Sequence, residues 1–73
     1  MADPHAASSK QKLVRRIVEH LEAAASAARA AQTHAEAGDA DQALAMLGNV
    51  EPPLYEATTL LNAASILRDN HAR

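Results

Sequence analysis

The chain has 73 residues and a mass of 7.7 kDa, which limits it to a single small domain. It contains no cysteine, so disulfides, thiolate metal sites and cysteine nucleophiles are excluded. Tyr55 is the sole aromatic residue and the formal net charge is −2, which argues against a base-stacking platform and against a polycation. The first residues are polar and no apolar run is long enough to span a bilayer, so we expect a cytoplasmic location and no membrane contact.

The sequence predicts a long first helix. Ser8 and Gln11 have the spacing of a capping box, in which each side chain bonds an unpaired backbone N–H at the start of a helix. We therefore expect a disordered tail over residues 1–7, a first helix over about 9–37, and a single helical domain over 8–73.

Two shorter helices are predicted to follow. Gly38 is typical of the position just after a helix, and Asp39 is typical of an N-cap, which gives a second helix over about 39–47. Gly48-Asn49 is expected to stop that helix. Pro52-Pro53 breaks the chain and restarts it, because proline is tolerated in the first turn of a helix but not in its interior. The third helix is then expected over about 53–70. Strand patterns are missing, so the predicted fold class is all-α.

Apolar residues recur at intervals of three and four along the first and third predicted helices, as they do on a helix face that is buried. Alanine supplies most of them and buries little area, so a lone chain has a small core. We expect an antiparallel helical hairpin whose second arm is broken at Pro52-Pro53, and pairing of two hairpins into a homodimeric four-helix bundle. The alanine-rich stretch 23–37 is either a close dimer contact or an exposed, helix-favouring segment. The larger side chains of the expected interaction stripe are Leu13, Ile17, Leu21, Leu54, Leu60, Leu61 and Leu67.

Charge is sorted along the hairpin. Residues 1–20 and 62–73 carry six Lys or Arg against three Asp or Glu, whereas residues 21–61 carry one against six. The open end is therefore expected to be basic and the turn end acidic. The basic end is either a solvated helix face or an anion-binding site for phosphate, nucleic acid or an acidic partner. Its candidate residues are Lys10, Lys12, Arg15, Arg16 and Arg68.

The sequence carries no pattern of a catalytic or cofactor site. The serines lack a nucleophile elbow, and the two glycines stand apart, so there is no glycine-rich phosphate loop. No His-x-x-x-His or Glu-x-x-His pair occurs, so metal-site motifs of helical bundles are missing. A meeting of His5 and His71 at the open end leaves a metal-binding bundle as an alternative. We expect a protein that is not an enzyme and has no cofactor.

Three short segments resemble the small helical metal- and aldehyde-sensing repressors of the CsoR/RcnR type. They are Arg15-Arg16 on the long first helix, Gly38-Asp39 at the hairpin turn, and Asn70-His71 at the end of the last helix. The resemblance implies a regulator that binds DNA through basic helices on a tetramer. The cysteine ligands of that family have no counterpart here and only His71 matches a sensing position, so we do not extend the sensor function to this chain.

The preferred hypothesis is a non-enzymatic, self-associating helical module for protein–protein interaction or regulation. It would recognise its partner through the apolar stripe, with the sorted charge setting orientation. The alternatives are a nucleic-acid-binding regulator that uses the basic open end, and a metal-binding bundle.

Overall fold

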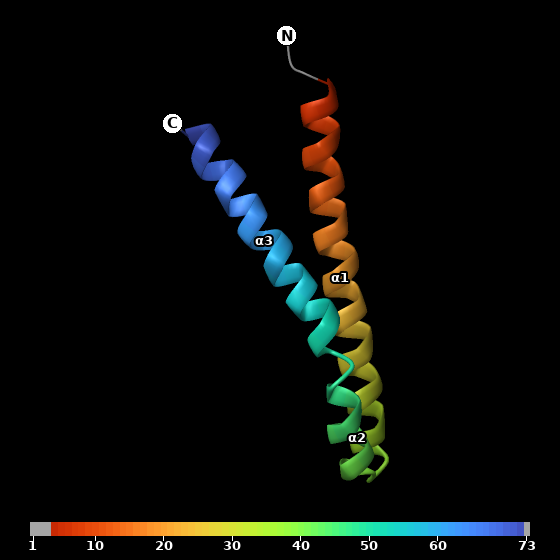
Figure 1. Cartoon of the computed structure of the whole chain (residues 1–73). Coiled ribbons are helices and arrows are strands. Elements are labelled where there is room, and N and C mark those ends of the chain that lie inside the picture. Colours follow the sequence, from red (N-terminus) through yellow and green to blue (C-terminus); the bar gives the residue numbers. More distant parts are fainter. Residues whose placement is uncertain (1–3, 73) are drawn as a thin grey trace.

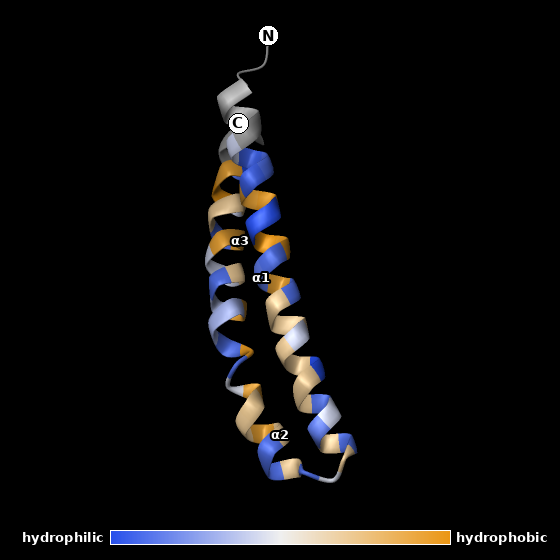
Figure 2. Ribbon diagram, turned by 90° about the vertical axis from the view of Figure 1, so that its right-hand side faces the viewer, coloured by the Kyte–Doolittle hydropathy of each residue, from blue (hydrophilic) through white to orange (hydrophobic). Residues whose placement is uncertain are grey.

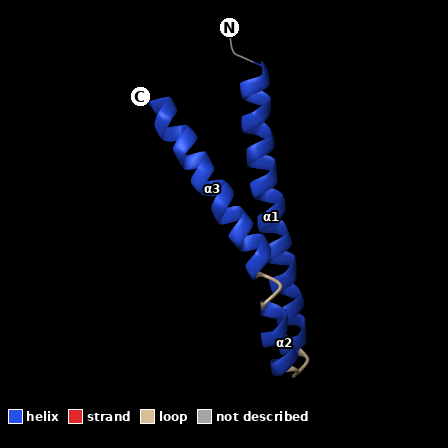
Figure 3. Cartoon of the chain, viewed as in Figure 1, coloured by secondary structure: helices blue, strands red, loops and turns tan. Residues whose placement is uncertain are grey.

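A computed structural model describes the backbone of residues 4–72 and the side chains of residues 9–69. This part of the chain is helical throughout except for two short turns (Figure 3). Helix α1 covers Pro4–Glu36, α2 covers Ala40–Leu47 and α3 covers Glu51–Ala72. Helices α2 and α3 run back along α1, and both contact it (Figure 1). The fold is therefore an antiparallel helical hairpin with one continuous arm and one bent arm.

Helix α1 starts earlier than the sequence pattern predicts. It begins at Pro4, five residues before the expected start, so Ser8 lies within the helix and does not cap it. Proline suits the first turn of a helix because its fixed φ is already helical and its missing N–H has no helical partner to lose. Of the predicted disordered tail, residues 1–3 lie outside the part of the chain that the structure describes.

The hairpin turn is built on Gly38, which has a φ of 88°. That left-handed conformation lets the N–H of Gly38 donate to the carbonyl of Ala35 and the N–H of Asp39 donate to the carbonyl of His34, at 3.1 and 2.9 Å. These two bonds form a Schellman motif, which satisfies carbonyls at the end of α1. Asp39 then caps α2, because its Oδ1 accepts a hydrogen bond from the Gln42 N–H at 3.2 Å.

The second arm bends at residues 48–50, and this corrects the predicted break at Pro52-Pro53. Gly48, Asn49 and Val50 each donate a backbone hydrogen bond to the residue three positions earlier, which closes a tight turn after α2. Both prolines belong to the first turn of α3. The first α3 bond runs from the Leu54 N–H to the Val50 carbonyl, at 3.1 Å. The prolines therefore occupy positions whose N–H groups have no helical partner, and they cost the helix no hydrogen bond.

The hairpin buries one row of side chains from each arm, spaced alternately by three and four residues as in a coiled coil. Every position of these inner rows is buried or half-buried as far as Ala64. The row on the second arm keeps its spacing across the bend at residues 48–50. The inner row of α1 is Leu13, Ile17, His20, Ala24, Ala27, Ala31 and His34; that of the second arm is Ala43, Met46, Val50, Pro53, Ala57, Leu60 and Ala64, followed by the exposed Leu67.

The most deeply buried positions of this core are mostly alanine. Of the five buried side chains in the described part of the chain, four are alanines and the fifth is Ile17; among them Ala57 alone has no exposed area. The short side chains let α2 lie close to α1, whereas α3 diverges from α1 toward the open end (Figure 1). Figure 2 shows the matching gradient along α1, from strongly hydrophobic residues in the half near the open end to weakly hydrophobic ones near the turn.

The molecule is long and thin. Its principal extents are 57 × 19 × 14 Å, and its radius of gyration is 16.9 Å. A compact domain of this length has a radius of gyration of about 11 Å. The accessible surface is 5714 Å², compared with about 4,300 Å² for a compact monomer of this mass. A single chain thus exposes about 1,400 Å² more than a globular protein of its size.

Candidate interaction surface

Most of the large apolar side chains of the hairpin are exposed. Ten of them are more than a third exposed, and in seven cases the exposed residue comes directly after an inner-row residue in the sequence. These seven side chains belong to a second row on each arm, which we call the outer row and which has the same alternating spacing of three and four residues. The outer row of α1 is Val14, Val18, Leu21, Ala25, Ala28, Gln32 and Ala35; that of the second arm is Ala40, Leu44, Leu47, Glu51, Leu54, Thr58, Leu61, Ser65 and Arg68.

The two outer rows lie on the same side of the hairpin. One residue turns an α-helix by about 100°. On each arm, a side chain one residue after an inner-row position therefore points to the side of the contact between the arms. Because the two arms run in opposite directions, it is the same side for both arms. Together the rows form one face, the groove face, whose seven large side chains are 42% to 67% exposed.

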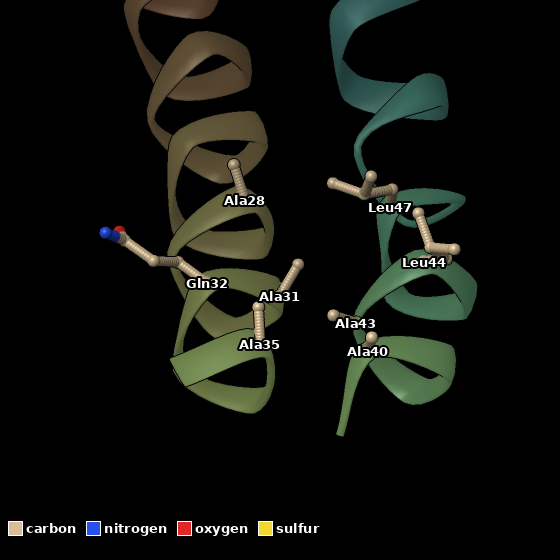
Figure 4. A pocket seen from close by; sticks show the side chains of 8 residues that line it. All are labelled: Ala28, Ala31, Gln32, Ala35, Ala40, Ala43, Leu44 and Leu47. Atoms are coloured by element: carbon tan, nitrogen blue, oxygen red, sulfur yellow. The ribbon is translucent and has the colours of Figure 1, made fainter. Parts of the chain in front are cut away.

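A groove at the turn end confirms this geometry. It has a volume of about 420 Å³ and lies between α1 and α2 (Figure 4). Ala31 and Ala43 from the inner rows form its floor and point toward each other. Its walls come from both outer rows, and apart from the amide of Gln32 they are apolar: Ala28, Gln32, Ala35, Ala40, Leu44 and Leu47.

A second groove of about 230 Å³ lies between α1 and α3 at the open end. Leu13, Ala64 and Leu67 come from the inner rows, and Val14 and Arg68 from the outer rows. Lys10 completes the lining. The groove exists because α1 and α3 diverge here, so that even the inner-row Leu67 is 46% exposed. The same face is therefore hollowed at both ends.

The structure divides the predicted interaction stripe between two faces. Leu13, Ile17, Leu60 and Leu67 belong to the inner rows, and the first three are buried or half-buried. The other three, Leu21, Leu54 and Leu61, are exposed on the groove face. The spacing of apolar residues predicted a single stripe because the inner and outer rows are adjacent on each helix. The predicted stripe also lacks His20 and His34 of the α1 inner row, because their polar rings carry no apolar signal.

The predicted basic residues are all exposed, and the structure brings two of them to one groove. Lys10 and Arg68 flank the open-end groove from α1 and α3. Arg68 also lies 3.7 Å from Asp69 in a solvent-exposed ion pair, which contributes little to stability. Lys12, Arg15 and Arg16 lie on α1 outside this groove.

A row of alternating charge borders the groove face along α1. It follows every second position of the outer row by one residue and therefore repeats every seven residues, with the sequence Arg15, Glu22, Arg29, Glu36, all exposed; Glu19 follows an intervening outer-row position. We call it the charged edge. The equivalent positions on the second arm are Asp41, Gly48, Tyr55, Asn62 and Asp69, which include no cation.

The structure offers no candidate metal centre among the residues it describes, since no three His, Asp or Glu side chains come together there. His20 and His34 are half-buried on α1 and separated by four helical turns. The side chains of His5 and His71 lie outside the described part of the chain. None of the described helices has an apolar stretch sufficient to cross a bilayer.

Comparison of the chain with protein-family models, with curated proteins and with solved structures finds no match in any of the three.

Proposed function

We propose that the chain is a non-enzymatic helical module that acts by self-association through its groove face. The observation that carries this proposal is the position of the large apolar side chains. Seven of them lie on one exposed face, whereas four of the five buried side chains in the described part of the chain are alanines. Large apolar side chains gathered on one exposed face of a small protein are typical of an interaction site.

The energetics favour the same conclusion. Alanine burial contributes little free energy, and no large side chain in the described part of the chain is fully buried. Domains of this size commonly need oligomerisation, a metal or disulfides to be stable. This chain has no cysteine, so disulfides do not contribute, and we propose that covering the groove face supplies the missing stability.

The surface area fits a dimer. The excess of about 1,400 Å² over a compact monomer exceeds the roughly 800 Å² that each partner buries in a standard interface. Two hairpins stacked through their groove faces form a four-helix bundle, in which the outer rows become a second core layer.

A matched pair of substitutions on α3 tests the proposal. Leu54 and Ile66 are both large, apolar and exposed, but only Leu54 lies on the groove face. We expect Leu54→Ser to raise the dissociation constant of the dimer by at least tenfold, because it removes a side chain that becomes buried on association. Ile66→Ser should leave the dissociation constant within about twofold. Sedimentation equilibrium measures both; equal effects would contradict the assignment of the face.

A further inference from the structure

We infer that the occupant of the groove face is a second copy of the same chain, stacked with its hairpin turn at the opposite end. This inference rests on the proposed function and adds the orientation and register of the two copies. Two-fold symmetry allows two ways of stacking one groove face on another. The turns lie either at the same end, with each α1 beside the second arm of the other copy, or at opposite ends, with the two α1 helices side by side and antiparallel.

The distribution of charge along the hairpin favours the arrangement in which the hairpin turns of the two copies lie at opposite ends. No Lys or Arg occurs between Arg29 and Arg68, whereas the hairpin turn and its flanks contribute Glu36, Asp39 and Asp41. The open end presents four cations within residues 10–16 of α1. Turns at the same end place basic ends together and acidic ends together. Turns at opposite ends place each basic segment over the acidic turn of the other copy, which is the arrangement that opposite charge selects.

The charged edge fixes the register. Charges that flank the apolar seam of a coiled coil pair across it and set partner orientation. With two antiparallel α1 helices, one register places Arg15 opposite Glu36 of the second copy and Glu22 opposite its Arg29. By symmetry this gives four pairs of opposite charge. A shift of seven residues places Arg15 opposite Arg29 of the second copy and Glu22 opposite Glu22 of the second copy. Both pairs carry like charges, so the neighbouring register is repulsive. With the turns at the same end, the edge meets a row that has no cation.

Side-chain size agrees with this register. The bulky part of the α1 outer row, Val18 and Leu21, then lies across from the stretch Ala28, Gln32 and Ala35 of the same row in the second copy, in which two of the three residues are alanine. That stretch is a wall of the turn-end groove, which has a volume of about 420 Å³.

Charge reversal tests the register. We expect Arg15→Glu to raise the dissociation constant of the dimer about tenfold, since it replaces two attractive pairs by two repulsive ones. Glu36→Arg should do the same. The double variant Arg15→Glu/Glu36→Arg restores the pairs with reversed polarity and should return the dissociation constant to within about threefold of the original. Arg16→Glu is the matched control, because it changes the charge of the basic segment equally but lies beyond the charged edge. It should raise the dissociation constant less than Arg15→Glu does, and an equal effect would contradict the register.

A distance between labels tests the orientation independently. The chain has no cysteine, so Ala37→Cys provides a single site for a spin label at the exposed turn. The inferred register separates the two turns by about 23 residues of helix, or about 35 Å. Turns at the same end would bring the labels to within about 20 Å, given the spacing of packed helices.

The outcomes separate this inference from the function on which it rests. A monomeric wild-type chain overturns the proposed self-association itself. A dimer that shows the short label distance, or that is not rescued by the double charge reversal, leaves self-association standing and overturns the inferred orientation and register. A dimer with the long distance and with rescue by the double variant supports both.

Discussion

The backbone N–H of Asp39 donates to the carbonyl oxygen of His34 at 2.9 Å, and this bond is possible because Gly38 between them has a φ of 88°. The two arms of the hairpin are therefore joined by a turn that depends on one glycine. The second glycine, Gly48, has an ordinary helical φ of −59°. The same substitution at the two positions should consequently have opposite effects.

We expect Gly38→Ala to lower the free energy of unfolding by about 1–2 kcal/mol, because an L-residue is strained in the left-handed region whatever space surrounds it. Gly48→Ala should raise it by up to about 1 kcal/mol, since alanine adopts this conformation without strain. Its added Cβ would approach the Ala45 carbonyl oxygen at 3.4 Å, an ordinary contact. Urea unfolding followed by circular dichroism measures both values. Equal destabilisation by the two variants would contradict this account of the turn.

The cap of α2 gives a second prediction. Asp39→Ala removes the side-chain acceptor of the Gln42 N–H and should lower the free energy of unfolding by about 1 kcal/mol. Asp39→Asn keeps an acceptor oxygen and should recover most of that loss. Thermal unfolding of the wild-type chain and the two variants measures these differences. If Asp39→Asn lowers the free energy of unfolding as much as Asp39→Ala does, the charge of Asp39, rather than its hydrogen bond, stabilises the helix.

Among the side chains that the structure describes, Ala57 is the most completely buried, with no exposed area, at the contact between α3 and α1. Enlarging it should force the two helices apart, so Ala57→Leu is expected to lower the free energy of unfolding by about 1–3 kcal/mol. The exposed Ala63 on the same helix is the control, and Ala63→Leu should change stability by less than about 0.5 kcal/mol. Urea unfolding of both variants tests whether α3 packs against α1 through Ala57.

The basic open end gives a prediction about nucleic acid. If its cations lie over the acidic turn of a second copy, they are not free for phosphates, and the chain should not bind duplex DNA at physiological salt. Fluorescence anisotropy with a labelled duplex measures this. Binding that weakens steeply with salt, and that is lost in Lys10→Ala/Arg68→Ala, would instead support the regulator alternative.

Local turn chemistry allowed most of the fold to be predicted. Gly38 and Asp39 indicated the hairpin turn and the start of α2, because each is chosen by a specific backbone requirement. The start of α1 was wrong because the capping-box spacing of Ser8 also occurs inside a helix. The bend was assigned to Pro52-Pro53, whereas the chain turns just before them, since proline restricts its own helix only beyond the first turn.

The candidate surface could be predicted only in part. Hydrophobicity alone cannot separate the inner row of α1 from its outer row, because Leu21 is more apolar than the adjacent His20 although His20 is the half-buried residue. Alanines occur in both rows, so they do not distinguish the rows by hydrophobicity either. The inner row can be identified only from the structure, in which the second arm covers one of the two adjacent rows and leaves the other exposed.

The measurement that tests the account most directly is the native mass of the wild-type chain by sedimentation equilibrium, with circular dichroism of the same samples across a dilution series. We predict a helical species of twice 7.7 kDa that loses mass and helicity together on dilution, because the groove face is the main apolar surface available for burial. A monomer that stays fully helical at all concentrations would contradict the central claim, since it would show that the alanine core alone supports the fold.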